Sequence, residues 1–270
     1  MLLGLHSWSF YRSFADGAVD LPGFVELAAG LGVDGVEIAP DHVADWGALA
    51  ALGARATDLG LYADLDDSTG LVHEGDAADA HARHIEGMLR AAAALGAQNL
   101  RTFVGADRFR RGIPLARQLE IAAALLGRYG PLAEAAGVYI CVENHGDLRS
   151  DELLAVIEGA AHPHICCCLD THGPVYVGED PLLAVRRLVP YARMSHFADA
   201  VIHHKPWGHV ITSGPWGDGV CEMEAIARVF AELAPGCHLN VEQVEGEGDE
   251  LAAATEAVRR ARACLDVVGG

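Results

Sequence analysis

The chain has 270 residues, with 19 lysines and arginines against 38 aspartates and glutamates, and its formal net charge is −19. This charge argues against nucleic acid or an anionic membrane as a partner, because both need a cationic surface. The length is ordinary for one α/β barrel, so we expect a single domain over residues 1–270.

The cysteines and the first residues indicate the compartment. None of the seven cysteines belongs to a CxxC pair. The N-terminal stretch lacks the basic region and long apolar run of a signal peptide, and no apolar run is long enough to span a membrane. We therefore expect free thiols in a cytoplasmic protein.

Aliphatic strand-like runs alternate with alanine-rich amphipathic segments eight times, which is typical of repeated βα units. The strands are expected at residues 3–9, 35–38, 61–65, 99–104, 138–143, 165–170, 192–197 and 238–242. The helices are expected from Pro22 onward, at about residues 44–59, 77–95 and 114–136, after Ser150 as N-cap, and at 181–189, 222–233 and 250–265. Residues 10–21, 66–76 and 198–221 are expected to be loops. Strict alternation of this kind predicts one closed (β/α)8 TIM barrel.

Four consecutive strands each end in a side chain that can bind a metal ion: Glu143, Asp170, His196 and Glu242. Parallel strands of a closed barrel end at the same mouth, where such barrels build their active sites. An acidic residue at a strand end is often only a salt-bridge or cap partner, but four in succession favour a common site. Carboxylates with one imidazole suit Mn, Mg, Co or Zn, and manganese is our first choice.

Several nearby side chains are candidates for substrate binding. His145 and His172 each lie two residues beyond a predicted ligand, so they would face the same way if the strand geometry persists. Each could support a ligand, bind substrate, act as an extra base or be polar surface. His6 alternates with Trp8 on the first strand, which indicates an inward-facing wall or a core histidine. Lys205 could bind a hydroxyl or phosphate, although exposed cations usually face solvent.

Three further groups carry weaker expectations. Glu37, near the end of the second strand, could reach the pocket or form only a salt bridge within the barrel. The loop after the fourth strand adds cations that could bind substrate: Arg108, Arg110 and Arg111. His81 and His84 lie on a predicted helix, away from the strand ends, so we expect them to be structural.

The four ligand-bearing stretches, 141–145, 168–172, 194–199 and 240–243, resemble in order and spacing the xylose isomerase-like TIM barrels, a superfamily of sugar isomerases and epimerases that also holds endonuclease IV. The resemblance spans essentially the whole chain. It implies, by analogy with ketose 3-epimerase and hydroxypyruvate isomerase-like members, that Glu143, Asp170, His196 and Glu242 hold the metal and that both glutamates move the proton. The chain departs from many relatives in two places, with Ala198 where they have lysine and Gly173 where they have histidine.

The leading hypothesis is a divalent-metal-dependent isomerase or epimerase acting on a small carbohydrate or keto-polyol through an enediolate. The runner-up is a lyase on the same scaffold, either a dehydratase or a C-glycoside-cleaving enzyme that eliminates from a keto sugar, with His145 as the extra base. An endonuclease IV-like enzyme would need more histidine ligands and a basic DNA track. A barrel that binds a sugar or partner without turnover also stays open, as does a homo-oligomer.

Overall fold

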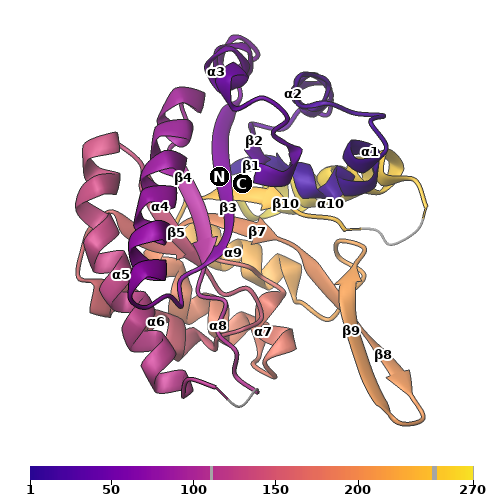
Figure 1. The fold of residues 1–270 in the computed structure, drawn as a ribbon. Helices are drawn as coiled ribbons and strands as arrows, with labels where there is room; N and C mark the ends of the chain where they lie inside the picture. Colours follow the sequence, from indigo (N-terminus) through magenta and orange to yellow (C-terminus); the bar gives the residue numbers. More distant parts are fainter. Residues whose placement is uncertain (110–111, 245–247, 270) are drawn as a thin grey trace.

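The computed structural model describes residues 1–109, 112–244 and 248–269. Eight parallel strands close a barrel in the order β1-β10-β7-β6-β5-β4-β3-β2 (Figure 1). Their bounds are β1 Leu2–His6, β2 Gly35–Ile38, β3 Tyr62–Gly70, β4 Asn99–Phe103, β5 Tyr139–Glu143, β6 Ile165–Cys168, β7 Ala192–Phe197 and β10 His238–Val241. The predicted (β/α)8 TIM barrel is confirmed.

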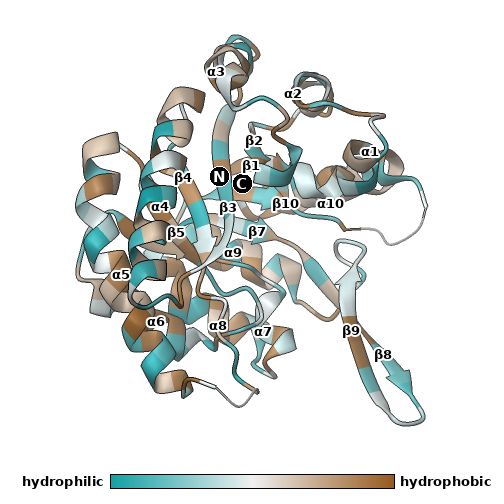
Figure 2. Ribbon diagram, viewed as in Figure 1, coloured by the Kyte–Doolittle hydropathy of each residue, from teal (hydrophilic) through white to brown (hydrophobic). Residues whose placement is uncertain are grey.

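The outer helices carry both hydrophobic and hydrophilic residues (Figure 2), as expected of helices with one side on a barrel and one in solvent. They are α2 Leu21–Gly30, α3 Leu49–Asp58, α4 Asp76–Leu95, α5 Leu115–Ala136, α6 Ser150–Ala160, α8 Pro181–Leu188, α9 Met223–Leu233 and α10 Glu250–Gly269. Two short helices lie in the connections, α1 Tyr11–Ala15 and α7 Gly173–Tyr176. In the part of the chain that the structure describes, no helix combines the length and apolar character needed to cross a bilayer.

Local chemistry sets several helix ends. Asp20 and Asp180 accept hydrogen bonds from backbone N–H groups in the first turns of α2 and α8, at 2.8 and 2.9 Å. Gly96 ends α4 with φ +77°, a left-handed conformation that favours glycine. Ser150 was predicted to be the N-cap of its helix but is the first helical residue, and its hydroxyl donates to Glu179 instead.

Three connections differ from the prediction. β1 ends at His6, and Ser7–Phe10 form a 3-10 helix, so Trp8 does not alternate with His6 on a strand. β3 continues through residues 66–70, which were expected to form a loop. Residues 198–221, also expected to be a loop, contain an antiparallel hairpin of β8 Asp199–Lys205 and β9 Gly208–Gly214, which projects from the barrel (Figure 1).

The inside of the barrel is filled below the mouth. Cys141, Cys168 and Met194 form a buried sulfur-rich cluster. On the opposite side, the Tyr62 ring occupies space left by a glycine, since a Cβ on Gly35 would lie 2.3 Å from that ring. The filled interior leaves the polar residues of the strand ends at the mouth as the place for chemistry.

Candidate metal centre

Charged side chains converge, buried, at the carboxyl ends of the strands. His6, Glu37, Asp66, Glu143 and His196 are each at most 4% exposed. Neighbouring strands present them in register, since His6 pairs with Glu37 across β1 and β2, and His196 pairs with Asn240 across β7 and β10. Buried charges are costly unless they are paired or coordinated, so this concentration is a candidate functional site.

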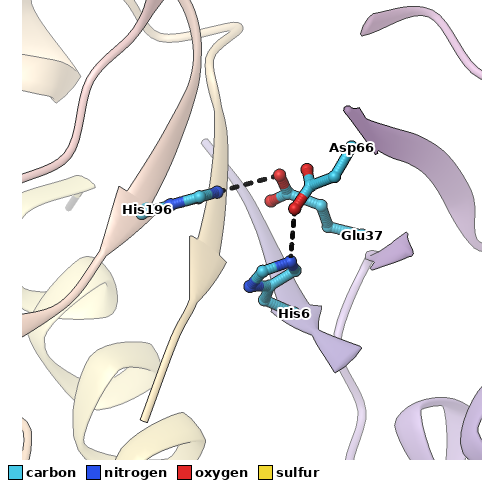
Figure 3. Close-up of side chains that lie close together, drawn as sticks. All are labelled: His6, Glu37, Asp66 and His196. Carbon is cyan, nitrogen blue, oxygen red and sulfur yellow. Dashed lines mark hydrogen bonds and ion pairs between the residues drawn. The ribbon is translucent and has the colours of Figure 1, made fainter. Parts of the chain in front are cut away.

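His196 lies at the centre of the cluster and uses both ring nitrogens. Its Nε2 donates to Glu37 Oε1 at 2.9 Å (Figure 3). Its Nδ1 lies 2.8 Å from Glu143 Oε1 and 3.5 Å from Glu242 Oε2. The contact with Glu37 fixes the ring and directs Nδ1 toward the two predicted catalytic glutamates.

His6 joins the same cluster from β1. Its Nε2 lies 2.9 Å from Asp66 Oδ2 (Figure 3), and its Nδ1 lies 3.2 Å from Glu242 Oε1. The imidazole rings of His6 and His196 stack with centroids 4.9 Å apart. His6 therefore orients Glu242 in the way that Glu37 orients His196.

A chain of hydrogen bonds below the mouth holds Glu37 in place. The Tyr62 hydroxyl donates to Asn240 Oδ1 at 2.6 Å, and Asn240 Nδ2 donates to Glu37 Oε2 at 2.6 Å. Because Glu37 contacts His196, this chain connects the filled barrel interior to the orientation of the imidazole.

Asp170 follows β6 and is fixed by its neighbours. Asn144 forms a pair of hydrogen bonds, both 2.8 Å, with the backbone N–H and C=O of Asp170. The Asp170 carboxylate accepts the backbone N–H of His172 at 2.9 Å and lies 2.5 Å from its Nδ1. Burial acts to lower the pKa of His172, but the charges of Asp170, Glu242 and Glu143 outweigh it and raise the pKa to about 9. Three of the predicted ligands, Asp170, Glu143 and Glu242, thus all act on the charge of His172.

Arg101 on β4 is a site residue that the sequence analysis did not identify. Its guanidinium is buried and donates to Glu143 Oε2. Burial alone would raise the pKa of Glu143, but Arg101 and His196 hold it well below its usual range. A charged residue in the middle of the strand Asn99–Phe103 was the signal that could have revealed it.

Two groups of donor atoms could hold a cation. In the first, Glu143 Oε1 and His196 Nδ1 are buried, form an ion pair at 2.8 Å and have no other hydrogen-bond partner among the described residues. A carboxylate oxygen and an imidazole nitrogen that face one another in this way fit two ligands of one ion, and Glu242 lies beside them. The second group is His6, Glu37, Asp66 and His196, whose ligand atoms all lie within 4.8 Å of one another. His196 belongs to both.

The chemistry of the donors separates the two groups. In the second group each histidine already forms a hydrogen bond with a carboxylate, His6 with Asp66 and His196 with Glu37. Such carboxylate–histidine pairs ordinarily surround a metal site and orient its ligands. His196 Nδ1 belongs to both groups, and Asp66 Oδ1 of the second group is also buried without a hydrogen-bond partner among the described residues. We favour the first group because its unpartnered carboxylate oxygen, Glu143 Oε1, lies only 2.8 Å from His196 Nδ1.

The other predicted substrate-binding residues lie in different surroundings. The His145 ring is 4.8 Å from Phe103, and its charge acts to lower the pKa of Glu143, so it belongs to the mouth. Lys205 is exposed at the end of β8 on the projecting hairpin (Figure 1). Arg108 pairs with Glu152, while Arg110 and Arg111 lie outside the described residues. Substrate binding by all of these residues stays a prediction.

The histidine pKa values predict how stability depends on pH when no metal is bound. Burial acts to lower the pKa of His6, but Asp66 and Glu37 raise it to about 10, and that of His172 is about 9. A raised folded-state pKa gives stability that is complete below about pH 6.5 and is lost as the pH rises through 9 to 10. We expect the melting temperature of EDTA-treated protein to fall from pH 7 to 10. The fall should be smaller in His172→Gln and unchanged in the exposed hairpin variant His209→Gln, whereas a rise over this interval would contradict the assignment.

Comparisons with known proteins agree with this architecture. A family model described as xylose isomerase-like TIM barrel matches residues 25–265. No curated protein matches the sequence. An L-ribulose 3-epimerase structure is 19% identical with a TM-score of 0.79, and the match covers 99% of this chain and 95% of that one. The IolI protein with a bound zinc atom is 17% identical, with a TM-score of 0.76 and coverage of 99% and 98%. The AsbF protein of Bacillus anthracis, described as a probable 3-DHS dehydratase, is 15% identical, with a TM-score of 0.77 and coverage of 96% and 98%.

Proposed function

Since the chain belongs to the xylose isomerase-like TIM barrel family, we propose that it is a divalent-metal-dependent isomerase or epimerase. Its substrate is a small sugar or keto-polyol, and the reaction moves a proton next to a carbonyl group through an enediolate. Glu143, Asp170, His196 and Glu242 hold the metal, with manganese as first choice and magnesium, cobalt or zinc as alternatives. His145, His172 and His6 border the substrate.

One observation carries this proposal. Glu143 Oε1 and His196 Nδ1 form a buried ion pair at 2.8 Å, and neither atom has another hydrogen-bond partner among the described residues. Glu242 Oε2 lies 3.5 Å from the same nitrogen. When bound, the ion acts as a Lewis acid that polarises the carbonyl and neighbouring hydroxyl of the substrate. The zinc atom bound in the IolI structure supports the proposal that this fold holds a cation. Metal-binding measurements on this protein would identify the cation.

The two glutamates reach His196 Nδ1 from separate strands of the barrel. Glu143 ends β5 and Glu242 follows β10, and β6 and β7 lie between these strands in the barrel. When two carboxylates approach a bound carbon acid from two directions, one can act as the base and the other as the acid. Arg101 keeps Glu143 ionised and able to accept a proton, while His6 holds Glu242 through a hydrogen bond.

Solvent exchange tests the proposal directly. The protein is treated with EDTA, reloaded with Mn²⁺, and incubated in D₂O with a panel of pentuloses and hexuloses. We expect one deuterium to enter beside the carbonyl of a turned-over ketose, and we expect EDTA to abolish the exchange. Exchange that persists undiminished in EDTA would refute the metal requirement, whereas ketose binding without exchange would support a barrel that binds without turnover.

The runner-up function is a lyase that eliminates a β leaving group after the same proton abstraction. The position of His145 favours it, because a second titratable group close to Glu143 could assist the leaving group. Mass spectrometry of the products separates the two reactions. Loss of water or of an aglycone indicates a lyase, whereas an isomer of unchanged mass indicates an isomerase or epimerase.

A further inference from the structure

An open cavity of about 900 Å³ lies between the segment after β1 and the segment after β2. Trp8, Tyr11 and Phe14 line it from the first segment, and Leu49 and Leu52 of α3 line it from the second. The volume is within the range of small-molecule sites, and the lining is predominantly aromatic and aliphatic. Most of these lining side chains offer no hydrogen-bonding group to the hydroxyls of a sugar. The cavity therefore favours a less polar ligand.

The cavity adjoins the candidate metal centre. His42, which lines it, has its Nδ1 3.0 Å from the hydroxyl of Ser7, the residue after His6. The His42 ring stacks on Phe14 with centroids 3.9 Å apart and on Trp8 at 5.4 Å. The stacked rings of Trp8, His42 and Phe14 therefore form one wall of the cavity. Trp8 is two residues from His6 of the candidate metal centre.

The charges around the cavity restrict what it can bind. Three carboxylates, Asp20, Asp41 and Asp45, lie among its lining residues. The basic residue of the lining, Arg55, pairs with Glu26, its Nε donating at 2.6 Å. An anionic ligand would be repelled by the aspartates and would find Arg55 already engaged, whereas an uncharged ring would stack on the aromatic wall.

We propose that this cavity binds an uncharged aromatic group. Resting on the proposed function, that group is part of the substrate, so the site acts on a sugar or polyol that carries an aryl substituent. The sugar lies at the mouth with Glu143 and Glu242, and the aryl group lies against Trp8 and Phe14. Burial of one aromatic ring of this kind gives enough free energy to strengthen binding at least about tenfold.

A pair of variants on α3 tests the cavity without disturbing the metal centre. Ala51 and Ala50 are both exposed, but only Ala51 lines the cavity. Ala51→Trp is expected to fill it, and Ala50→Trp is the control of equal size. The probes are 4-nitrobenzyl alcohol, which is uncharged, and 4-nitrobenzoate, which is an anion of similar shape. Their dissociation constants are measured by calorimetry.

We expect wild type and Ala50→Trp to bind the alcohol alike, at least tenfold tighter than 4-nitrobenzoate, and Ala51→Trp to weaken the alcohol at least tenfold. Equal binding of both probes, or binding unchanged by Ala51→Trp, would overturn the proposal. Sedimentation of wild type and Ala51→Trp reveals whether a second copy covers the cavity, and dissociation of an oligomer by Ala51→Trp would also overturn it.

Two glucosides test whether the aromatic group in the cavity is part of the substrate. 4-Nitrophenyl β-D-glucoside and methyl β-D-glucoside carry the same sugar, and we expect Ala51→Trp to weaken only the aryl glucoside. Equal weakening of both, or no preference for the aryl glucoside in wild type, counts against an aryl-bearing substrate. These binding measurements need no turnover. Deuterium exchange without preferred binding of the aryl glucoside would reject only the aryl-bearing substrate. Preferred binding of the aryl glucoside without deuterium exchange would reject only the proposed function.

Discussion

Glu143→Gln is expected to lower the rate of solvent deuterium exchange by about 10²- to 10⁴-fold, since an amide cannot accept the proton. The same change should weaken Mn²⁺ binding, because the amide removes a negative charge beside His196 Nδ1, 2.8 Å from the carboxylate in wild type. Exchange is followed by mass spectrometry and Mn²⁺ binding by electron paramagnetic resonance. Wild-type exchange with wild-type Mn²⁺ affinity would contradict both roles of Glu143.

The structure adds a second consequence of this substitution. Arg101 is buried, and Glu143 neutralises it. A buried charge deprived of its partner costs about 3–5 kcal/mol, so Glu143→Gln should also be less stable. Glu242→Gln leaves that pair intact and is expected to lose exchange with a smaller loss of stability. Glu224→Gln, exposed on α9, is the control and should change neither property.

Gly53→Ala is expected to destabilise the fold by about 3 kcal/mol or more, the upper part of the range for overpacking. Gly53 lies in α3, where an added Cβ would stand 2.0 Å from the backbone oxygen of Leu95 at the end of α4. Backbone cannot rotate away, so the two helices would have to separate. The free energy of unfolding is measured by denaturant titration monitored by circular dichroism.

Gly87→Ala is the matched control. Gly87 is also inside a helix, α4, but the nearest atom to its added Cβ is the flexible end of Arg90, at 3.9 Å. Alanine has the better helix propensity, so this variant should be stabilised by about 0.5–1 kcal/mol. If both variants unfold at the denaturant concentration of the wild type, α3 and α4 do not approach as closely as described.

The sequence by itself determined the barrel and the candidate ligands. Strand and helix periods are local patterns, and repetition eight times leaves few other ways to bury the apolar faces. Because parallel strands of a barrel end together, Glu143, Asp170, His196 and Glu242 could be grouped without knowing any distance between them. Their role as metal ligands remains a prediction that binding measurements must test.

Only the tertiary structure decided which groups support that site and what lies beside it. The contacts of His196 with Glu37 and of His6 with Asp66 join residues 159 and 60 positions apart, which no local pattern encodes. Asp66 was assigned to a loop because its polar neighbours suggest one, whereas pairing with β4 extends the strand. The aromatic cavity arises between segments that follow different strands. Local order follows from the neighbours in the chain, whereas burial, pairing and empty space depend on which distant segments come into contact.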